Sequence, residues 1–454
     1  MPSQSSCPDA ELLKSLCEEF KNNNYIDPAA FTNFNVKRGL RNADGTGVVA
    51  GVTLVGNVHG YVLNEGEKVP IEGKLTYRGI DVADLVNGFV TENRFGFEET
   101  AYLVLIGELP NKSQLEKFTQ ILGKTRLLPP GFTEDMLIKA PSNNVMNKLA
   151  RATLALYSYD DNPDDISLEN SLAQAMQLIA RFPTIISLAY QVKRHYYDNE
   201  SLVLRYPIPE LSTAENILRL SKKYGEYTQE EARLLDLCLV LHVEHGGGNN
   251  SAFACRVLSS TCTDTYSAIA AAVGSLKGPR HGGANIKVSH MLDDIKQNVQ
   301  NWSSDDEVAS YLEKIIRKEV GDKSGLVYGM GHAIYTISDP RAVMLKIYAR
   351  KLAEKNGYIN EFNLIESVER LTPEVFARVK GDTKAMCANV DLYSGLVYKM
   401  LGIPMELYTP LFATARIVGW MAHRIEELQN GGRIIRPAYK PISHGKCFVP
   451  LAER

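Results

Sequence analysis

The segment LHVEHGGGNNS, residues 241–251, places two histidines and a glutamate directly before three glycines and two asparagines. It ends a nearly all-apolar run, so a buried helix is expected to stop close to His245. The glycines there let the backbone approach a ligand closely. A helix of small residues over 266–276 leads in the same way to KGPRHGGAN, where His281 stands beside a glycine pair. Two histidines in the same setting indicate a functional site more strongly than either does alone.

A metal site is the first alternative for the opening segment. His242 and His245 have i,i+3 spacing and supply two ligands, whereas zinc takes three or four. His242 also shares the apolar helix face of Leu235, Cys238 and Leu239, which is typical of a buried, hydrogen-bonded histidine. A metal-dependent hydrolase built on these histidines is therefore a rival hypothesis, and no metal is predicted.

A third histidine lies in GMGHAIYTISDPRA, residues 329–342. His332 follows two glycines, and Asp339 and Pro340 are the expected N-cap and first residue of a helix. Arg341 then falls in the first turn, where the helix dipole disfavours a cation, so a bound anion is one explanation for it. The alternative is an arginine that extends to solvent. The apolar face expected for this helix consists of Val343, Met344, Ile347 and Tyr348.

Two further arginines bear on anion binding. Arg416 is the only charged residue of PLFATARIVGWMA, in a helix expected to open at Thr409 and Pro410. An unpaired buried arginine costs roughly 3–5 kcal/mol, so a carboxylate from the protein or from a ligand should answer its charge. Arg436, in GGRIIRPAYK, follows a helix by way of a glycine pair, a pattern that a surface arginine explains equally well.

One acid completes the set of candidate groups. Asp391, in CANVDLYSG, stands between two apolar residues near the expected start of a helix. It is either an ordinary N-cap or a general base. A helix N-terminus lowers the pKa of a carboxyl group, whereas a base for a carbon acid benefits from a raised pKa. The sequence leaves that question open.

The elements that must position these residues are almost all helical. Apolar residues recur at spacings of three and four through most of the chain, and Thr228 with Glu231 has the spacing of a capping box. Residues 1–20 show one apolar helical face and acidic residues, unlike a signal peptide. The exception is the segment 47–73, rich in valine and glycine, which predicts a few short strands or loops.

Composition excludes several classes of protein. The chain has 454 residues, enough for two domains, and 50 Lys plus Arg against 53 Asp plus Glu give a net charge of −3. It has no basic stripe and no apolar run of about 20 residues, so neither nucleic acid nor membrane is an expected partner. The seven cysteines are scattered without a C-x-x-C pair, which fits a reducing cytoplasm.

The motifs together resemble the citrate synthase family, which includes 2-methylcitrate synthase. The resemblance covers roughly residues 75–437 and rests on the following segments in this order: LTYRGIDVADL, LHVEHGGGNNS, GSLKGPRHGGAN, GMGHAIYTISDPR, NVDLYSG and ARIVGW. The pattern GxGHxxYxxxDPR is the most specific of them.

This resemblance implies a mainly helical, all-α chain with two domains, apart from the short β-like segment near the N-terminus. The large domain would comprise residues 1–282 and 395–454, with a small domain inserted at 283–394. It also implies a homodimer that needs no cofactor and no metal, and that condenses acetyl-CoA with oxaloacetate. Propionyl-CoA as the acyl donor, as in 2-methylcitrate synthase, stays open, because one methylene gives a discrimination of only about 1–3 kcal/mol.

The family's site residues carry over onto matching positions of this sequence. The resemblance implies the catalytic residues His281, His332 and Asp391, and the oxaloacetate ligands His245, Arg341, Arg416 and Arg436. For CoA it implies the loop of Val327, Gly329, Met330 and Gly331. Thr336 stands where the family often has a basic residue, and Lys384 is a candidate substitute cation. A non-catalytic binding relative is the last alternative, although all three catalytic residues are present.

Overall fold

The computed structural model describes residues 10–65, 67–381, 385–443 and 445–454. The chain divides into two units. The first combines Met1–Gly51 with Arg436–Arg454, and the second is Val52–Ile435. All helices that carry candidate site residues belong to the second unit. Arg436, which lies in no helix, belongs to the first unit.

The first unit consists of short helices and extended chain. It contains α1 (Ala10–Asn23), α2 (Ala29–Asn33) and the 3₁₀ turns Arg38–Leu40 and Leu451–Glu453. None of the residues in these helices is buried. The amphipathic helix predicted near the N-terminus is therefore present as α1.

A small antiparallel sheet opens the second unit. Its strands are β1 (Gly56–Asn64), β2 (Glu67–Tyr77) and β3 (Ile80–Asp81), in the order β1-β2-β3. This confirms the strands predicted for the valine- and glycine-rich segment. The hydroxyl of Tyr77 donates to the carbonyl oxygen of Val240 at 3.1 Å, which ties the end of β2 to helix α9 (Gln229–His242).

A glycine in β2 allows this strand to contact the segment before helix α14 (Pro340–Asn356). A Cβ atom on Gly73 would lie 2.1 Å from the carbonyl oxygen of Ser338, so only glycine lets the strand approach that segment this closely. The sheet thus braces the loop that contains His332.

Two long helices form the centre of the second unit. They are α7 (Leu168–Asp198) and α17 (Tyr408–Gln429), which pack against each other. Every residue of α17 from Tyr408 to Ile425 is buried. Helix α7 is long and apolar enough to cross a membrane, but 72% of its most apolar window is buried inside the protein, as in the core helix of a globular fold.

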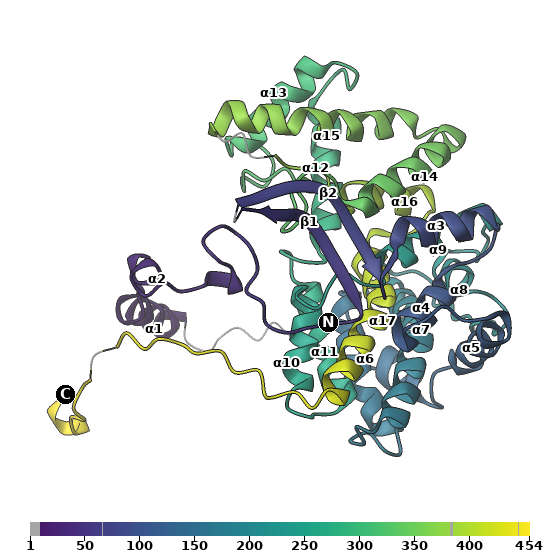
Figure 1. Cartoon of the computed structure of the whole chain (residues 1–454), viewed down its shortest axis with the longest axis horizontal. Coiled ribbons are helices and arrows are strands. Elements are labelled where there is room, and N and C mark those ends of the chain that lie inside the picture. Colours follow the sequence, from purple (N-terminus) through teal and green to yellow (C-terminus); the bar gives the residue numbers. More distant parts are fainter. Residues whose placement is uncertain (1–9, 66, 382–384, 444) are drawn as a thin grey trace. The chain divides into compact units, whose positions relative to one another are not determined.

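Figure 1 shows the remaining α-helices of the second unit, some packed around this centre and others gathered at one end. In chain order they are α3 (Val82–Thr91), α4 (Phe97–Ile106), α5 (Lys112–Thr125), α6 (Val145–Leu156), α8 (Thr213–Ser221), α10 (Asn250–Ser259), α11 (Thr265–Lys277), α12 (Ala284–Asn298), α13 (Asp305–Ile316), α15 (Ile359–Lys380) and α16 (Asp391–Met400). Short turns occupy Thr133–Ile138, Tyr157–Tyr159 and Met405–Leu407. The mainly helical class predicted from the sequence is confirmed.

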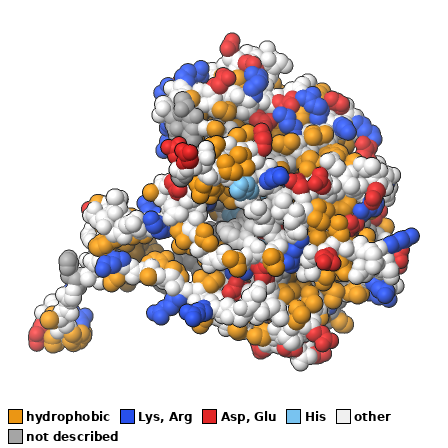
Figure 2. Space-filling view, in the orientation of Figure 1, with side chains coloured by type: hydrophobic (Ala, Val, Ile, Leu, Met, Phe, Trp, Pro, Cys, Tyr) orange, Lys and Arg blue, Asp and Glu red, His pale blue; other side chains and the backbone are white. Residues whose placement is uncertain are grey.

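Helices α12 to α16 contact one another extensively. The pairs α13 with α15, α14 with α16 and α12 with α16 are in contact, and Figure 1 shows these helices gathered at one end of the second unit. The inserted domain predicted for residues 283–394 would comprise α12 to α15 and only the first residues of α16. Figure 2 shows acidic and basic side chains interspersed over the visible face of the described residues.

Candidate active site

His245 lies in the loop that follows α9. Thr228 and Glu231 form the predicted capping box, and the helix ends at His242, three residues before the ring of His245. His245 is buried, and its Nε2 atom has no hydrogen-bond partner in the part of the chain that the structure describes. Burial and the nearby charge of Arg341 hold the pKa of His245 well below its ordinary value. The ring is therefore neutral.

Arg416 projects from the middle of α17 and is fully buried. Its Nε atom donates to the carbonyl oxygen of His242 at 2.7 Å, whereas Nη1 and Nη2 have no partner among the described residues. Burial lowers its pKa to about 10, against the opposing charge of Glu244. No carboxylate of the described protein bonds to this guanidinium group, so its charge is left for a ligand.

A close helix contact places Arg416 in this position. A Cβ atom on Gly419, in the same helix, would lie 2.6 Å from the carbonyl oxygen of Val243. Only glycine therefore lets α17 come so near to the chain around His245. Helix α17 begins at Tyr408, one residue before the predicted start at Thr409, whose hydroxyl donates to the carbonyl oxygen of Gly282 at 3.2 Å.

Arg341 has a protein partner. Asp339 caps α14 as predicted, and its carboxylate also accepts from Nε of Arg341 at 3.0 Å and from Nη2 at 2.7 Å. Both side chains are buried, so the alternative of an arginine extending to solvent is wrong. Burial opposes the charge of Arg341, but the carboxylate of Asp339 raises its pKa above the ordinary value. Asp339 thus answers the cation that the sequence suggested a ligand would answer, and the Nη1 edge lies outside this pair.

The helix face predicted for α14 is only partly correct. Met344 is buried, but Val343 and Ile347 are 48% and 50% exposed. Leu345 and Leu352 are buried in their place. The helix packs between several neighbours, and their positions decide which of its apolar side chains are covered.

His332 stands in a loop held by backbone contacts. Gly329 and Gly331 have φ values of +82° and +86°, and Met330 forms an isolated antiparallel bridge with Ala388. The ring accepts at Nδ1 from the backbone N–H groups of Ile334 and Tyr335, both at 3.1 Å. A ring nitrogen that accepts carries no proton, so in the neutral ring the proton lies on Nε2.

Aromatic contacts fix the plane of the same ring. His332 stacks on Tyr335 with a centroid separation of 4.5 Å, and it meets His245 edge to face at 5.1 Å. The histidines from two loops that are distant in sequence are therefore neighbours.

Asp391 is the first residue of α16 and caps nothing. The side chain of Asn389 accepts from the backbone N–H of Asp391 at 3.0 Å, so the N-cap alternative for Asp391 is wrong. Its Oδ1 atom is buried and has no partner within the described ranges. Burial raises the pKa of Asp391 to about 7, although Arg341 and Arg416 oppose the rise. Desolvation therefore outweighs the positive charges of the two arginines.

His281 follows α11, as predicted, and contacts a serine. Its Nε2 atom lies 3.0 Å from Oγ of Ser251, which also accepts from Nε1 of Trp420 and lies 2.9 Å from Oδ1 of Asn249. The serine hydroxyl has one proton and can donate to only one partner. If it donates to Asn249, Nε2 of His281 must carry the ring proton. If it donates to Nε2 of His281, the ring proton lies on Nδ1. Burial lowers the pKa of His281 to about 4, so the ring is neutral in either case.

The remaining predicted residues are the candidate CoA ligands, Thr336 and Arg436. Val327 is buried in the loop before His332, and Lys384 falls outside the described residues. Thr336 has a buried hydroxyl with no partner in the described chain. Arg436 is exposed and belongs to the first unit.

His242 is buried, as predicted, but its expected hydrogen bond is missing. Its ring lies 4.3 Å from that of Phe412, and Nδ1 has no partner among the residues described. The described residues contain no group of three or more His, Cys, Asp or Glu that could hold a metal.

Ser251 and Asn389 were not predicted as site residues from the sequence. Asn389 had a readable signal, because an asparagine two residues before a helix start is a common capping arrangement. Ser251 had none, since its contact with His281 spans thirty residues. Together the site offers two buried cations for an anion, neutral histidine donors and one carboxyl group that is half ionised near pH 7. Such a set suits an enzyme that removes a proton from carbon beside a carbonyl group.

Comparison with known proteins supports the same class. The family model for the C-terminal domain of citrate synthase matches residues 45–438. Citrate synthases from Synechocystis sp. and Acidithiobacillus ferridurans are 34% and 36% identical over 390 and 389 residues. These alignments cover 84% of this chain and 89% and 93% of the relatives. A 2-methylcitrate synthase from Shewanella oneidensis is 32% identical over 383 residues, 84% of this chain and 92% of the relative.

Solved structures agree in fold. The crystal structure of citrate synthase from Thermotoga maritima superposes with a TM-score of 0.72 at 30% identity, over 92% of this chain and 99% of that chain. The citrate synthase of Thermoplasma acidophilum, in a ternary complex with carboxymethyl coenzyme A and oxaloacetate, gives 0.74 at 27% identity with the same coverage. The chain belongs to the citrate synthase family, whose members are acyltransferases.

Proposed function

We propose that this chain condenses acetyl-CoA with oxaloacetate and water to give citrate and free CoA. The observation that carries the proposal is the buried Oδ1 atom of Asp391, which has no partner among the described residues and belongs to a carboxyl group with a pKa of about 7. A base with this pKa is ionised in part at neutral pH and still binds a proton well enough to take one from carbon.

The chemistry assigns one role to each catalytic side chain. Asp391 takes a proton from the acetyl methyl group while His281 donates to the thioester oxygen, so the nucleophile is an enol. The enol carbon attacks the ketone carbon of oxaloacetate, and Nε2–H of His332 stabilises the oxygen that gains charge. Water then cleaves the thioester of citryl-CoA, which releases the carboxylate and the CoA thiol. Each acid–base contribution is of the order of 10²–10⁴ in rate.

The role of His281 requires its proton on Nδ1. Since Nε2 faces Ser251, the required tautomer exists when the serine hydroxyl donates to the ring. A neutral imidazole donor suits this step, because the pKa of His281 of about 4 excludes an imidazolium ion at neutral pH.

Oxaloacetate would be bound through its two carboxylates. The two Nη atoms of Arg416, the Nη1 edge of Arg341 and Nε2 of His245 are the candidate donors, and Arg436 is kept as a further ligand on the resemblance alone. Charge-assisted bonds to guanidinium groups are short and often bidentate. The lack of a partner for Nη1 and Nη2 of Arg416 among the described residues supports this assignment most directly.

CoA would meet the loop of residues 327–331, and Lys384 is the proposed cation for a CoA phosphate. We also propose the cytoplasmic homodimer, the absence of any cofactor, and an inserted domain at 283–394 that closes over the substrates. The six described cysteines are unpaired, which suits a reducing compartment.

Comparing acyl donors tests the proposal. The ratio of kcat/KM for acetyl-CoA to that for propionyl-CoA, with oxaloacetate saturating, should favour acetyl-CoA, and the carbon product should be citrate. A 2-methylcitrate synthase among the relatives makes propionyl-CoA the second candidate donor. Higher kcat/KM with propionyl-CoA would replace the first assignment by that one. Release of CoA that the Asp391→Asn variant reproduces at full rate would contradict both.

A further inference from the structure

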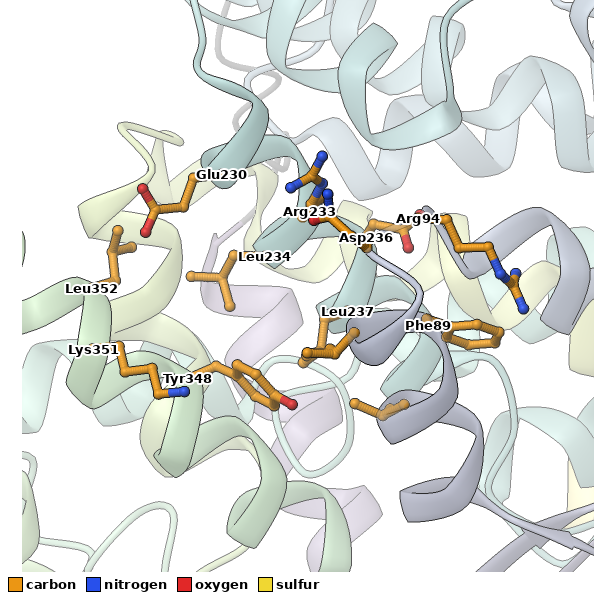
Figure 3. Close-up of a pocket in the computed structure, with 13 residues that line it drawn as sticks. Phe89, Arg94, Glu230, Arg233, Leu234, Asp236, Leu237, Tyr348, Lys351 and Leu352 are labelled. Atoms are coloured by element: carbon orange, nitrogen blue, oxygen red, sulfur yellow. The ribbon is translucent and has the colours of Figure 1, made fainter.

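A separate pocket of about 200 Å³ lies between α3, α9 and α14 (Figure 3). Its walls are mainly apolar and include Val86, Phe89, Leu234, Leu237 and Leu352. It contains none of the candidate active-site residues. A cavity of about 150 Å³ already holds a benzene molecule, so this one has room for a phenyl ring or a short alkyl chain.

The acids that line the pocket are engaged by the protein. Asp236 accepts from the backbone N–H groups of Gly96 and Phe97 at 2.6 and 3.3 Å, at the start of α4. Glu230 forms an ion pair with Lys355. Burial raises the pKa of Asp236, which disfavours its negative charge, and Lys355 balances the charge of Glu230, so neither acid is available to attract a cationic ligand.

Two cations of the same pocket are not engaged in this way. Within the described residues, neither Arg233 nor Lys351 has a carboxylate partner at ion-pair distance, and both side chains are exposed. The Nζ atom of Lys351 lies 5.6 Å from the ring centroid of Tyr348, another lining residue. Arg94, the third cation, pairs with Glu92 and Glu99. The pocket thus combines an apolar interior with two unanswered positive charges.

We infer that this pocket binds a small amphipathic carboxylate, with its apolar body between α3, α9 and α14 and its carboxylate at the pocket mouth, where the positive charges of Arg233 and Lys351 attract it. The size of the cavity favours an alkyl chain of about six to eight carbon atoms or a single aromatic ring. The charge complementarity favours an anion over a neutral ligand of the same shape.

The position of the pocket connects it to the dicarboxylate site. Helix α9 leads directly to His245, and α14 begins at Pro340, with Asp339 as its N-cap and Arg341 in its first turn. A ligand that contacts both helices binds best at one separation of them, so it shifts any equilibrium in which that separation changes. This second step rests on the proposed function, because α14 belongs to the inserted domain proposed to close. Bound carboxylate is expected to change oxaloacetate affinity at least threefold, and oxaloacetate to change carboxylate affinity by the same factor.

The test uses the full chain and titrates hexanoate, octanoate and phenylacetate by calorimetry, with hexanol as the neutral comparison. One carboxylate of the series should bind at a single site, and Arg233→Gln with Lys351→Gln should weaken it at least tenfold. The matched control is Lys112→Gln with Lys117→Gln on α5, which removes the same charge from exposed positions. A third variant, Arg233→Lys with Lys351→Arg, should retain binding.

Several outcomes would overturn the site. Equal affinity in the Gln variant and the control removes the two cations from it, and stoichiometric displacement by oxaloacetate places the probe in the dicarboxylate site. A change of oligomeric state in the Gln variant alone would make the pocket mouth a contact between copies of the chain. Binding without any change in oxaloacetate affinity would overturn the coupling. All binding arms can be repeated in Asp391→Asn, so a failed catalytic proposal is distinguishable from a failed site.

Discussion

Two regions of the site contain a buried arginine in opposite electrostatic states. One is the first turn of α14, with Arg341, and the other is the middle of α17, with Arg416. Arg341 is bonded twice by Asp339, and that carboxylate raises its pKa. Arg416 bonds only to a backbone carbonyl oxygen, and burial lowers its pKa to about 10. One cation is therefore completed by the protein, while the other is incomplete within the described chain.

This difference separates stability from affinity. Removing one member of a buried pair leaves a buried charge alone, which destabilises the fold. Removing a buried charge that has no partner relieves the fold of a desolvation cost, so the loss should fall on ligand binding. Asp391, whose pKa is lowered by both arginines and raised by burial, responds to both regions.

The largest effect is expected from Asp391→Asn. The asparagine keeps the size of the side chain, and Asn389 still accepts from the backbone N–H at the start of the helix, so the fold should survive. Condensation, assayed as release of free CoA, should fall roughly 10²–10⁴-fold because the base is lost. Oxaloacetate affinity, measured by calorimetry, should stay within a few-fold. A variant that condenses at nearly the original rate would show that another group takes the proton.

The second effect concerns the paired cation. Arg341→Met leaves the carboxylate of Asp339 buried without its partner, so chemical denaturation should show a loss of about 3–5 kcal/mol in the free energy of unfolding. The double variant with Asp339→Asn should recover part of that loss, because no isolated charge then remains. Oxaloacetate affinity should also fall, and CoA affinity much less. Unchanged stability would mean that Asp339 does not depend on this arginine.

The unpaired cation should behave in the opposite way. Arg416→Met is expected to cost about 2–5 kcal/mol of oxaloacetate binding free energy, the scale for truncating one partner of a buried charge pair. Its thermal unfolding without ligand should be unchanged or shifted to higher temperature. If Arg416→Met unfolds as easily as Arg341→Met, the two regions do not differ as proposed.

The pH profile sharpens the comparison further. Asp391 acts as a base when ionised, so kcat/KM should fall about tenfold for each pH unit below about 7, where the free enzyme gains a proton. Since Arg416 lowers the pKa of Asp391, Arg416→Met should move this limb to higher pH. A profile limb that stays in place would exclude electrostatic contact between the two.

The free energy of unfolding should also depend on the ionisation of Asp391, but it should fall as pH rises, whereas kcat/KM rises. The pKa of Asp391 rises from 3.8 to about 7 on folding, so its ionisation destabilises the fold as pH rises through that interval. Thermal unfolding across this range should show the loss in the original chain and not in Asp391→Asn.

The smallest effect is expected from domain closure. If the helices α12–α16 close over α9 and α17, oxaloacetate should raise the affinity of a CoA analogue several-fold by shifting the population of states. Titration of the analogue with and without the dicarboxylate measures this. Arg416→Met, with its weakened dicarboxylate binding, should show less enhancement at the same oxaloacetate concentration.

Much of the local structure could be predicted because its causes are local. The capping box of Thr228 and Glu231, the cap of Asp339 before Pro340, and the strands in a valine- and glycine-rich segment depend on neighbouring residues. Histidines next to glycines at helix ends marked His245, His281 and His332 for the same reason. The motif order then indicated the family, since each segment adds specificity to the last.

The electrostatic state of the site could not be predicted, because it depends on desolvation by distant elements. Whether Asp391 is a cap or a base is decided by the surroundings that bury its Oδ1 atom, and by Asn389, whose side chain accepts from the backbone N–H of Asp391. Ser251 reaches His281 across thirty residues, and Gly419 brings Arg416 against the chain near His242. A residue's type limits which charges and hydrogen bonds it can carry. Tertiary packing removes water and selects the partners. Those two effects set the residue's pKa and decide which of its donor or acceptor atoms stay unbonded for a ligand.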